Sequence, residues 1–291
     1  MARILAVGIA TLDIINRVDS YPPEDSEVRA LSQRRVRGGN ATNSLVVLSQ
    51  LGHACAWAGV LVDEPDAVPV RAELDRYGID YSACRRLATG KIPTSYILHS
   101  QATGSRSIVH YRDLPEYDLE SFRRIDLAPL DWVHFEGRNV EQTEGMLAHL
   151  RMQRPDLPVS LEIEKPRPGI ERLFPRADLL LFSRDYARAQ GHDDAPALLQ
   201  AVAAQSPETD RVCAWGEAGA WALDRGGRLH HSPAFAPPQL VDTLGAGDTF
   251  NAALIDARLQ GAAWPESLVR ACRVAGAKCG REGLHGVSRD D

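Results

Sequence analysis

The sequence is poor in cysteine and has no long hydrophobic run. Its five cysteines are an odd number among 291 residues, and no two of them form a Cys-x-x-Cys pair. Such usage is typical of reduced thiols rather than a disulfide framework, so we expect a cytoplasmic protein. No stretch approaches the roughly 20 apolar residues that span a bilayer. The opening apolar run meets Asp13 before it reaches the length of a secretory signal. The sequence therefore predicts no membrane partner.

An excess of charge of one sign is also missing. The chain has 33 Lys and Arg against 39 Asp and Glu, a formal net charge of −6. A nucleic-acid-binding protein would be expected to carry a basic excess or a basic stripe, so we expect no nucleic-acid partner. Hydrophobic residues make up 44% and charged residues 25%, which is close to the average globular protein. The length favours one large α/β domain, alone or with a small appendage.

Two common nucleotide-binding signatures are absent. A P-loop requires Gly-x-x-x-x-Gly-Lys-Ser/Thr, but the only Gly-Lys pair, at residues 90–91, is followed by Ile92. A dinucleotide fold requires Gly-x-Gly-x-x-Gly after the first strand, and residues 8–13 read GIATLD. The nine histidines show no metal-ligand spacing, which argues against a structural zinc site.

Short apolar runs alternate with amphipathic segments along most of the chain. Strands are expected at residues 4–9, 54–61, 131–135, 159–163, 177–182 and 211–215. Helices are expected at residues 40–51, 140–153 and 196–204. This alternation requires crossover connections and predicts a mostly parallel sheet with helices on both faces. Ligands of such sheets bind outside the carboxyl ends of the strands.

Two polar stretches, residues 13–37 and 93–112, interrupt this alternation. The second has the pattern of a hairpin with Gly104 in its turn. We expect the two stretches to form one small antiparallel sheet, a candidate lid, that projects from a body of residues 1–12, 38–92 and 113–291. The alternative is a pair of unrelated surface excursions.

The most informative segment is LVDTLGAGDTFN at residues 240–251, because small residues bracket a single acid just before an amphipathic run. Gly245 and Gly247 permit close approach to the backbone, and the free N–H groups of a helix start favour a phosphate. A carboxylate there is useful if Asp248 receives the proton of an attacking hydroxyl. We expect the helix terminus to keep Asp248 ionised and weakly basic. The alternative is an ordinary helix cap.

A second glycine pair leads into a helix at RGGNATNS, residues 37–44. Asn40 and Asn43 fall on one face of its first turn, and two carboxamides suit recognition of a polyhydroxylated molecule. Alternatively, Asn40 caps the helix and Asn43 is an exposed polar residue. Asp13, expected at the end of the first strand, favours the sugar-site interpretation.

These two segments resemble the signatures of the ribokinase-like (PfkB) carbohydrate kinases. The strings that carry the resemblance are GGNATN at 38–43 and DTLGAGDTFN at 242–251. Further strings are similar to the members of that family that phosphorylate ketohexoses: YPPEDSE at 21–27, GSR at 104–106, FEGRN at 135–139, EKPR at 164–167, CAW at 213–215 and KCG at 278–280. The resemblance extends from near residue 4 to near residue 286.

The resemblance implies a ribokinase-like three-layer α/β/α fold and an ATP-dependent kinase that converts fructose to fructose 1-phosphate. It implies that Asp248 is the catalytic base. The implied anion hole consists of Gly245, Ala246 and Gly247. The implied sugar contacts are Asp13, Gly39, Asn40 and Asn43. The implied nucleotide contacts are Arg106 at the phosphates, Gly216, Glu217, Ala218 and Gly219 in a loop, and Pro237, Pro238 and Cys272 near the adenine. A homodimer formed through the lid is also implied.

The chain departs from the family where many members order Mg²⁺ through an Asn-x-x-Glu motif. The corresponding stretch here reads SRDY at residues 183–186. The Mg²⁺ ligands therefore stay open among Glu162, Glu164 and Asp185, as does a requirement for a monovalent cation such as K⁺. Two alternatives to a ketohexose kinase also stay open. One is a kinase of the same family for ribose, a nucleoside or a deoxyketo acid, and the other is a non-catalytic sugar-sensing protein.

Overall fold

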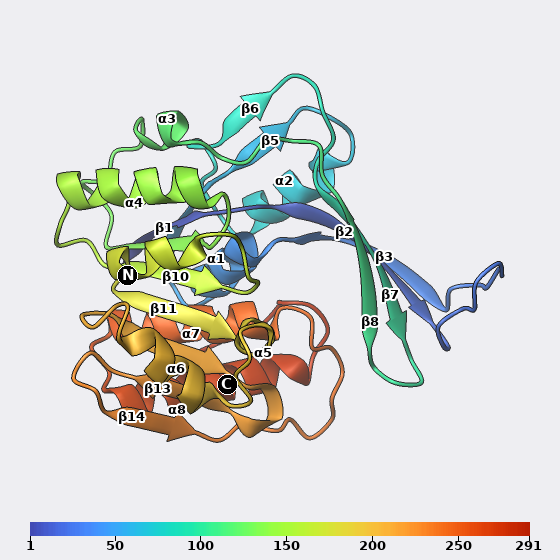
Figure 1. Ribbon diagram of the computed structural model, residues 1–291. Coiled ribbons are helices and arrows are strands. Elements are labelled where there is room, and N and C mark those ends of the chain that lie inside the picture. Colours follow the sequence, from blue (N-terminus) through green and yellow to red (C-terminus); the bar gives the residue numbers. More distant parts are fainter.

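The protein is built around an eight-stranded sheet, as the computed structural model of residues 1–291 shows (Figure 1). In spatial order its strands are β14 (Leu229–Ser232), β13 (Ala220–Leu223), β12 (Asp210–Ala214), β11 (Leu179–Ser183), β10 (Val159–Ile163), β9 (Trp132–Glu136), β1 (Arg3–Val7) and β4 (Ala54–Ala58). The strands from β4 to β12 pair in parallel, and β13 and β14 join them as antiparallel strands. The prediction of a mostly parallel sheet is confirmed.

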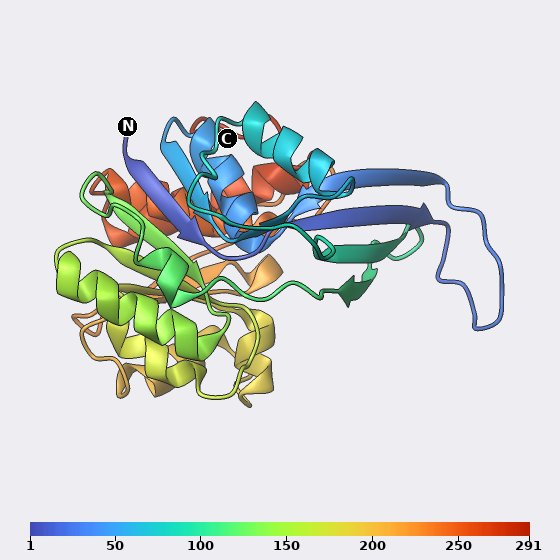
Figure 2. The same cartoon turned by 90° about the horizontal axis from the view of Figure 1, so that it is seen from above.

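Helices cover both faces of this sheet (Figure 2). One face carries α1 (Asn40–Gln50), α7 (Ala246–Leu259) and α8 (Trp264–Cys279), with α2 (Ala67–Arg76) beside α1. The other carries α3 (Leu119–Phe122), α4 (Val140–Gln153), the 3-10 helix η1 (Ile170–Arg176), α5 (Arg184–Ala189) and α6 (Ala195–Ala203). The three-layer arrangement follows because both faces of the parallel sheet are apolar and must be covered. No helix is both long and apolar enough to cross a membrane.

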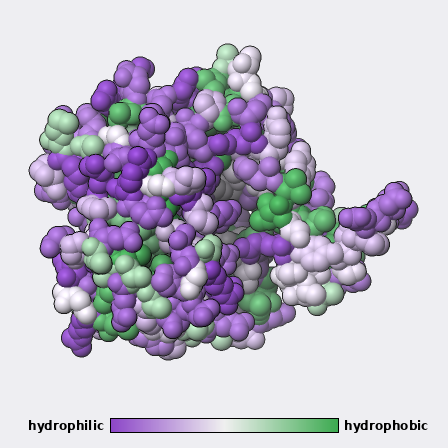
Figure 3. All heavy atoms as spheres, viewed as in Figure 1, coloured by the Kyte–Doolittle hydropathy of each residue, from purple (hydrophilic) through white to green (hydrophobic).

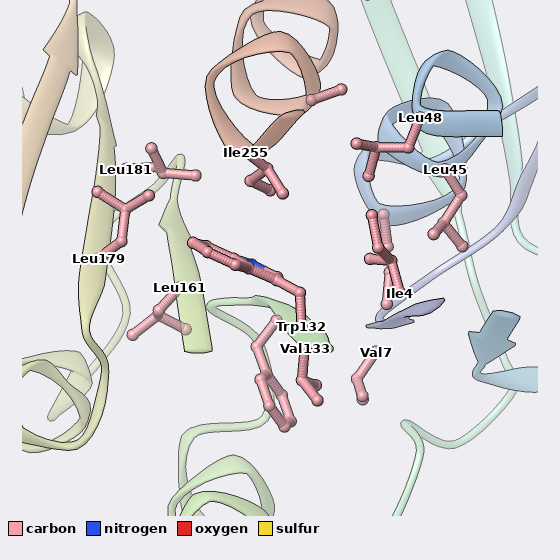
Figure 4. Packing of buried hydrophobic residues seen from close by; sticks show 14 of the residues in the cluster. Ile4, Val7, Leu45, Leu48, Trp132, Val133, Leu161, Leu179, Leu181 and Ile255 are labelled. Atoms are coloured by element: carbon pink, nitrogen blue, oxygen red, sulfur yellow. The ribbon is translucent and has the colours of Figure 1, made fainter. Parts of the chain in front are cut away.

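The core lies between the sheet and its two helical layers. Every residue of β9 and β10 is buried, including the polar His134 and Ser160 and the acids Glu136 and Glu162 near the ends of the two strands. On one face Ile255 points from α7 toward the sheet, and Leu45 of α1 lies beside Ile4 of β1 (Figure 4). This packing fixes the starts of α1 and α7 beside the carboxyl ends of the strands.

A four-stranded sheet projects from the body (Figures 1 and 2). Its order is β3 (Ser32–Gly38), β2 (Thr11–Val18), β7 (Thr94–Ser100) and β8 (Arg106–Tyr111). The outer pairs are antiparallel, whereas β2 and β7 pair in parallel because both strands run outward from the body. We call it the projecting sheet. It combines strands from both of the polar stretches that interrupt the α/β alternation.

One expected strand, at residues 54–61, is divided in the structure. β4 ends at Ala58, and β5 (Val60–Val62) pairs instead with β6 (Arg85–Leu87) in a separate two-stranded sheet. The division occurs at Gly59, where a Cβ atom would lie 2.6 Å from the Gly8 carbonyl oxygen. An apolar run therefore does not show by itself where a strand changes its partner.

Candidate active site

The start of α7 offers unpaired hydrogen-bond donors to the space above it. Gly245 precedes the helix with φ +75°, a left-handed conformation that favours glycine. The backbone N–H groups of Gly247 and Asp248 have no acceptor within the protein. A Cβ atom at Gly247 would meet nothing within 4 Å, so the space beside these donors is open. Such a helix start can accept an anion such as a phosphoryl group.

Asp248 lies in the first turn of α7 with 7% of its surface exposed. Its Oδ2 accepts a hydrogen bond from Asn43 Nδ2 at 2.6 Å. Burial raises the pKa of Asp248 to about 7, although the Asn43 bond lowers it. The carboxylates of Glu164 and Glu136 raise it further. The expectation of a weakly basic, ionised group is corrected here, because desolvation outweighs the helix terminus.

The start of α1 brings Asp13 close to the same region. Gly39 adopts φ +100°, and a Cβ atom there would lie 2.2 Å from the carbonyl oxygen of Ile9. A Cβ atom at Gly38 would lie 2.1 Å from Asp13 Oδ2, so the absence of a side chain at Gly38 lets this carboxylate approach the backbone. Asp13 is the third residue of β2 rather than the end of the first strand, because β1 stops at Val7. Burial raises the pKa of Asp13.

Asn40 and Asn43 have different partners although they share the first turn of α1. Asn40 Nδ2 donates to Glu162 Oε1 at 3.1 Å and to Glu164 Oε2 at 3.2 Å. Asn43 faces Asp248 instead. The two carboxamides therefore connect the start of α1 to Glu162 within β10, to Glu164 just after it, and to Asp248 in the first turn of α7.

Sequence reasoning missed Glu136 and Arg37. Glu136, the last residue of β9, accepts hydrogen bonds from the backbone N–H groups of Ala41 (2.7 Å) and Ile9 (3.1 Å) and so holds the start of α1. The signal was an acid ending a buried apolar strand. Arg37 is buried just before the glycine pair, and it bonds to Asn43. No periodicity marks a buried arginine on a polar strand.

Oxygen ligands suited to Mg²⁺ occur next to Asn40. Glu162 Oε2 is buried without a hydrogen-bond partner, and Glu164 lies across the Asn40 amide from it. Burial raises the pKa of Glu162 well above its usual value, and the neighbouring carboxylates of Asp248, Glu136 and Glu164 add to the effect. No group of three acidic, histidine or cysteine side chains is arranged to hold a metal alone. These residues fit an ion that keeps water and phosphate ligands, as Mg²⁺ does.

The stretch at residues 183–186, where many family members have Asn-x-x-Glu, forms the start of α5. Ser183 caps α5 by accepting a hydrogen bond from the N–H of Tyr186, and its hydroxyl donates to the Glu164 carbonyl oxygen at 2.6 Å. Asp185, in the first turn of α5, makes no hydrogen bond or ion pair through its side chain. Of the three acids considered for Mg²⁺, Glu162 and Glu164 are therefore the two that lie together.

Most of the residues expected near the nucleotide form one surface over α8. A Cβ atom at Gly276 would lie 2.1 Å from the Phe235 carbonyl oxygen, and one at Gly280 would lie 3.0 Å from Pro237 Cβ. Cys272 Sγ lies 4.0 Å from the Ser232 carbonyl oxygen. Since Cys272, Gly276 and the C-cap residue Gly280 are spaced four apart, residues 232–238 follow one face of that helix.

The loop before β13 is joined to the same surface. It contains Gly216, Glu217 and Ala218 in the 3-10 helix η2 (Gly216–Ala218) and then Gly219, whose Cβ atom would lie 2.0 Å from the Ser232 carbonyl oxygen. Arg106 is not brought there, because it begins the exposed strand β8 and its side chain makes no hydrogen bond. The structure thus gathers all the expected nucleotide residues except Arg106.

The fold matches solved structures of kinases. Ribokinase from Arabidopsis thaliana, solved with ribose and ATP, superposes with a TM-score of 0.80 at 20% identity, covering 99% of this chain and 96% of that one. Ribokinase from Cryptococcus neoformans with ADP gives a TM-score of 0.76 at 18% identity, covering 100% and 98%. The three-layer body with its additional sheet is therefore the ribokinase-like fold.

The sequence comparisons define the family. The pfkB family carbohydrate kinase pattern matches residues 1–290. The chain is 41% identical to ketohexokinase from Mus musculus over 98% of both chains. It is 27% identical to an ATP-dependent ribose-1-phosphate kinase from Halopiger xanaduensis, over 100% of this chain and 96% of that one. The chain belongs to the pfkB family of carbohydrate kinases, and it is an ATP-dependent sugar kinase.

Proposed function

We propose that this kinase phosphorylates a ketohexose, converting fructose to fructose 1-phosphate with ATP. The observation that carries the choice of substrate is the 41% identity to mouse ketohexokinase over 98% of both chains. It is supported by the candidate site, where Gly38 lets the Asp13 carboxylate approach the backbone and Asn43 faces Asp248. Gly39, Asn40, Asn43 and Asp13 are the proposed sugar contacts.

Asp248 is the proposed catalytic base. It removes the proton from the sugar hydroxyl as the hydroxyl oxygen forms a bond to the γ-phosphorus, and the bond between that phosphorus and the β–γ bridging oxygen breaks to release ADP. The backbone of Gly245, Ala246 and Gly247 forms the proposed anion hole for the phosphoryl oxygens; the Gly247 N–H has no acceptor in the protein, whereas the Ala246 N–H is shared with the Thr243 carbonyl oxygen. Since these donors are fixed by the helix start, they need no reorganisation during the transfer.

ATP is proposed to lie along the surface over α8. Residues 216–219, Pro237, Pro238 and Cys272 are its proposed contacts, and Arg106 is proposed to reach the phosphates from the projecting sheet. Glu162 and Glu164 would hold Mg²⁺, which neutralises phosphate charge when bound. The three buried cysteines, all free thiols, support a reducing compartment such as the cytoplasm.

The projecting sheet is proposed to act as a lid and as the contact between two copies of the chain. Figure 3 shows apolar side chains on this sheet and a hollow between it and the body. All six residues of β8 are exposed, and the apolar ones among them include Ile108 and Val109. A lid over the hollow would exclude water, which competes as a phosphoryl acceptor.

An acceptor panel tests the proposed substrate. ADP release is measured with a coupled assay on fructose, tagatose, ribose and adenosine at equal concentration. We expect fructose to give the highest kcat/KM. A preference of about tenfold or more for ribose or adenosine, equivalent to roughly 1.4 kcal/mol of transition-state stabilisation, would replace fructose as the substrate.

A further inference from the structure

Arg37 is a buried cation next to the candidate site that the proposed function leaves without a task. Its side chain is fully shielded from solvent near the end of β3. Removing a guanidinium from water is costly unless hydrogen bonds and opposite charge compensate it. The only paired acid, Glu73, has its Oε1 3.5 Å from Nη2, a long separation for a guanidinium and a carboxylate. The ion pair with Glu73 therefore does not account for this buried charge.

The short hydrogen bonds of Arg37 lead toward Asp248. Nη1 donates to Thr42 Oγ1 at 2.8 Å and to Asn43 Oδ1 at 2.8 Å. Asn43 Nδ2 then donates to Asp248 Oδ2 at 2.6 Å. The arginine, the amide and the proposed base thus form a single chain of hydrogen bonds.

This chain permits only one orientation of the Asn43 carboxamide. If the amide rotated by 180°, its NH₂ group would face the guanidinium donors and its oxygen would face the Asp248 carboxylate. Both contacts would be repulsive. With Oδ1 bound to Arg37, Nδ2 of Asn43 faces Asp248. One of its N–H bonds is used by Asp248, and the other is free for a sugar oxygen.

We infer that Arg37 is a positioning residue that acts through Asn43, holding the amide so that it presents N–H donors to Asp248 and the sugar together. The inference rests on the proposed function, in which Asp248 accepts the proton. It also assigns Asn43 a second task beyond contact with the sugar.

Several charged groups act on Asp248 from the surrounding elements. Negative groups are Glu136 from β9, Glu162 from β10 and Glu164 just after β10. Positive groups are Arg37 from β3 and Lys278 from α8. Because the positive charge of Arg37 lowers the pKa of Asp248, its loss should leave Asp248 harder to ionise.

The test compares Arg37→Met with Arg37→Lys. Fructose kinetics are measured between about pH 5.5 and 9, with circular dichroism to confirm folding. We expect Arg37→Met to raise the midpoint of the pH–rate profile by about one unit and to lower kcat about tenfold near neutral pH. Arg37→Lys keeps the charge, so it should restore the midpoint but not the full kcat. Arg124→Met, just after α3 in the body where the exposed Arg124 pairs with Glu120, is the control and should leave both values unchanged.

A double-mutant cycle separates positioning from a merely structural role. If Arg37 acts through Asn43, Arg37→Lys should cost less than about twofold in kcat once Asn43→Ala is present. Full additivity in the folded variants, or an Arg37→Lys enzyme with wild-type kcat, would overturn the inference. If Arg37→Met does not fold, the Arg37→Lys cycle decides the outcome.

Failure of the proposed function would look different from failure of this inference. The acceptor panel is run on the unaltered enzyme. If the enzyme prefers another sugar, the proposed substrate is replaced, and the double-mutant cycle is repeated with that sugar. Unchanged turnover in Asp248→Asn would remove the base. The coupling between Arg37 and Asn43 is measured independently of the acceptor preference and of the turnover of Asp248→Asn.

Discussion

At the residue scale, Asp248, as the proposed base, would have to accept a proton while its carboxylate is shielded from water. Its carboxylate is buried, hydrogen-bonded to Asn43, and next to free N–H donors of its own helix. We predict that Asp248→Asn folds and binds sugar but loses about 10²–10⁴-fold in kcat, because the amide cannot accept the hydroxyl proton. Calorimetric sugar binding and ADP release measure the two properties separately. Unchanged turnover would exclude Asp248 as the base.

The pKa of Asp248 also sets an expected pH dependence. Burial raises the pKa of Asp248 to about 7, and only the ionised carboxylate can accept a proton. Turnover should therefore rise as the pH increases through about 7 and level off above it. Steady-state kcat for fructose, measured across this range, checks the prediction. A rate that is already maximal at pH 5 would show that the base ionises far more easily than its burial indicates.

The same burial predicts a cost in stability. The pKa of Asp248 is 3.8 in an unfolded chain and about 7 when folded, so folding favours the protonated acid. Below pH 3.8 the acid is protonated in both states, and the folded protein keeps its full stability. As the pH rises from 3.8 through about 7, ionisation favours the unfolded chain and this stability is lost. Asp248→Asn has no such group to ionise. We therefore expect its Tm to exceed that of the unaltered enzyme at pH 8.

This difference in Tm should shrink on acidification. Thermal unfolding of both proteins at pH 8 and at progressively lower pH gives the comparison. A gap in Tm that is equal at all pH values would point to a packing effect of the amide rather than to the burial of charge. The prediction reflects a general trade-off between activity and stability, in which a buried ionisable group needed for the reaction lowers the stability of the fold.

At the element scale, α8 and residues 232–238 approach each other too closely for a side chain at Gly276. A Cβ atom there would lie 2.1 Å from the Phe235 carbonyl oxygen, so the backbone of the neighbouring segment would have to move. We predict that Gly276→Ala raises the KM for ATP several-fold and leaves the KM for fructose within about twofold. Arg273→Ala, an exposed position of α8 without an ion pair, serves as the control. Equal changes in both KM values would contradict a separate nucleotide surface.

The elements themselves were predictable where their apolar pattern is regular. The helix expected at residues 140–153 and the strand expected at 159–163 occur with those bounds, because local periodicity determines both. The division of the 54–61 run depended on the contact of Gly59 with the Gly8 carbonyl oxygen. Such contacts join distant parts of the chain, and periodicity does not report them.

The candidate site was predictable in its residue types but not in its connections. Glycine pairs before helices marked the starts of α1 and α7, and both occur where expected. The bond from Asn43 to Asp248 joins residues 205 positions apart. The buried partners Arg37 and Glu136 likewise depend on how β3 and β9 meet α1. Local chemistry therefore indicated what could bind, and the tertiary fold determined which groups touch.

At the scale of the whole molecule, the outer edge of the projecting sheet is unprotected. All six residues of β8 are exposed, and Val109 retains 69% of its accessible surface. An exposed apolar edge strand is normally covered or blocked by charge, so a second copy of the chain is a suitable cover. We predict a dimer at micromolar concentration by light scattering and dissociation in Val109→Lys. Val68→Lys, exposed on α2 of the body, should leave the dimer intact. A monomeric unaltered protein, or equal effects of both lysine substitutions, would refute assembly through this sheet.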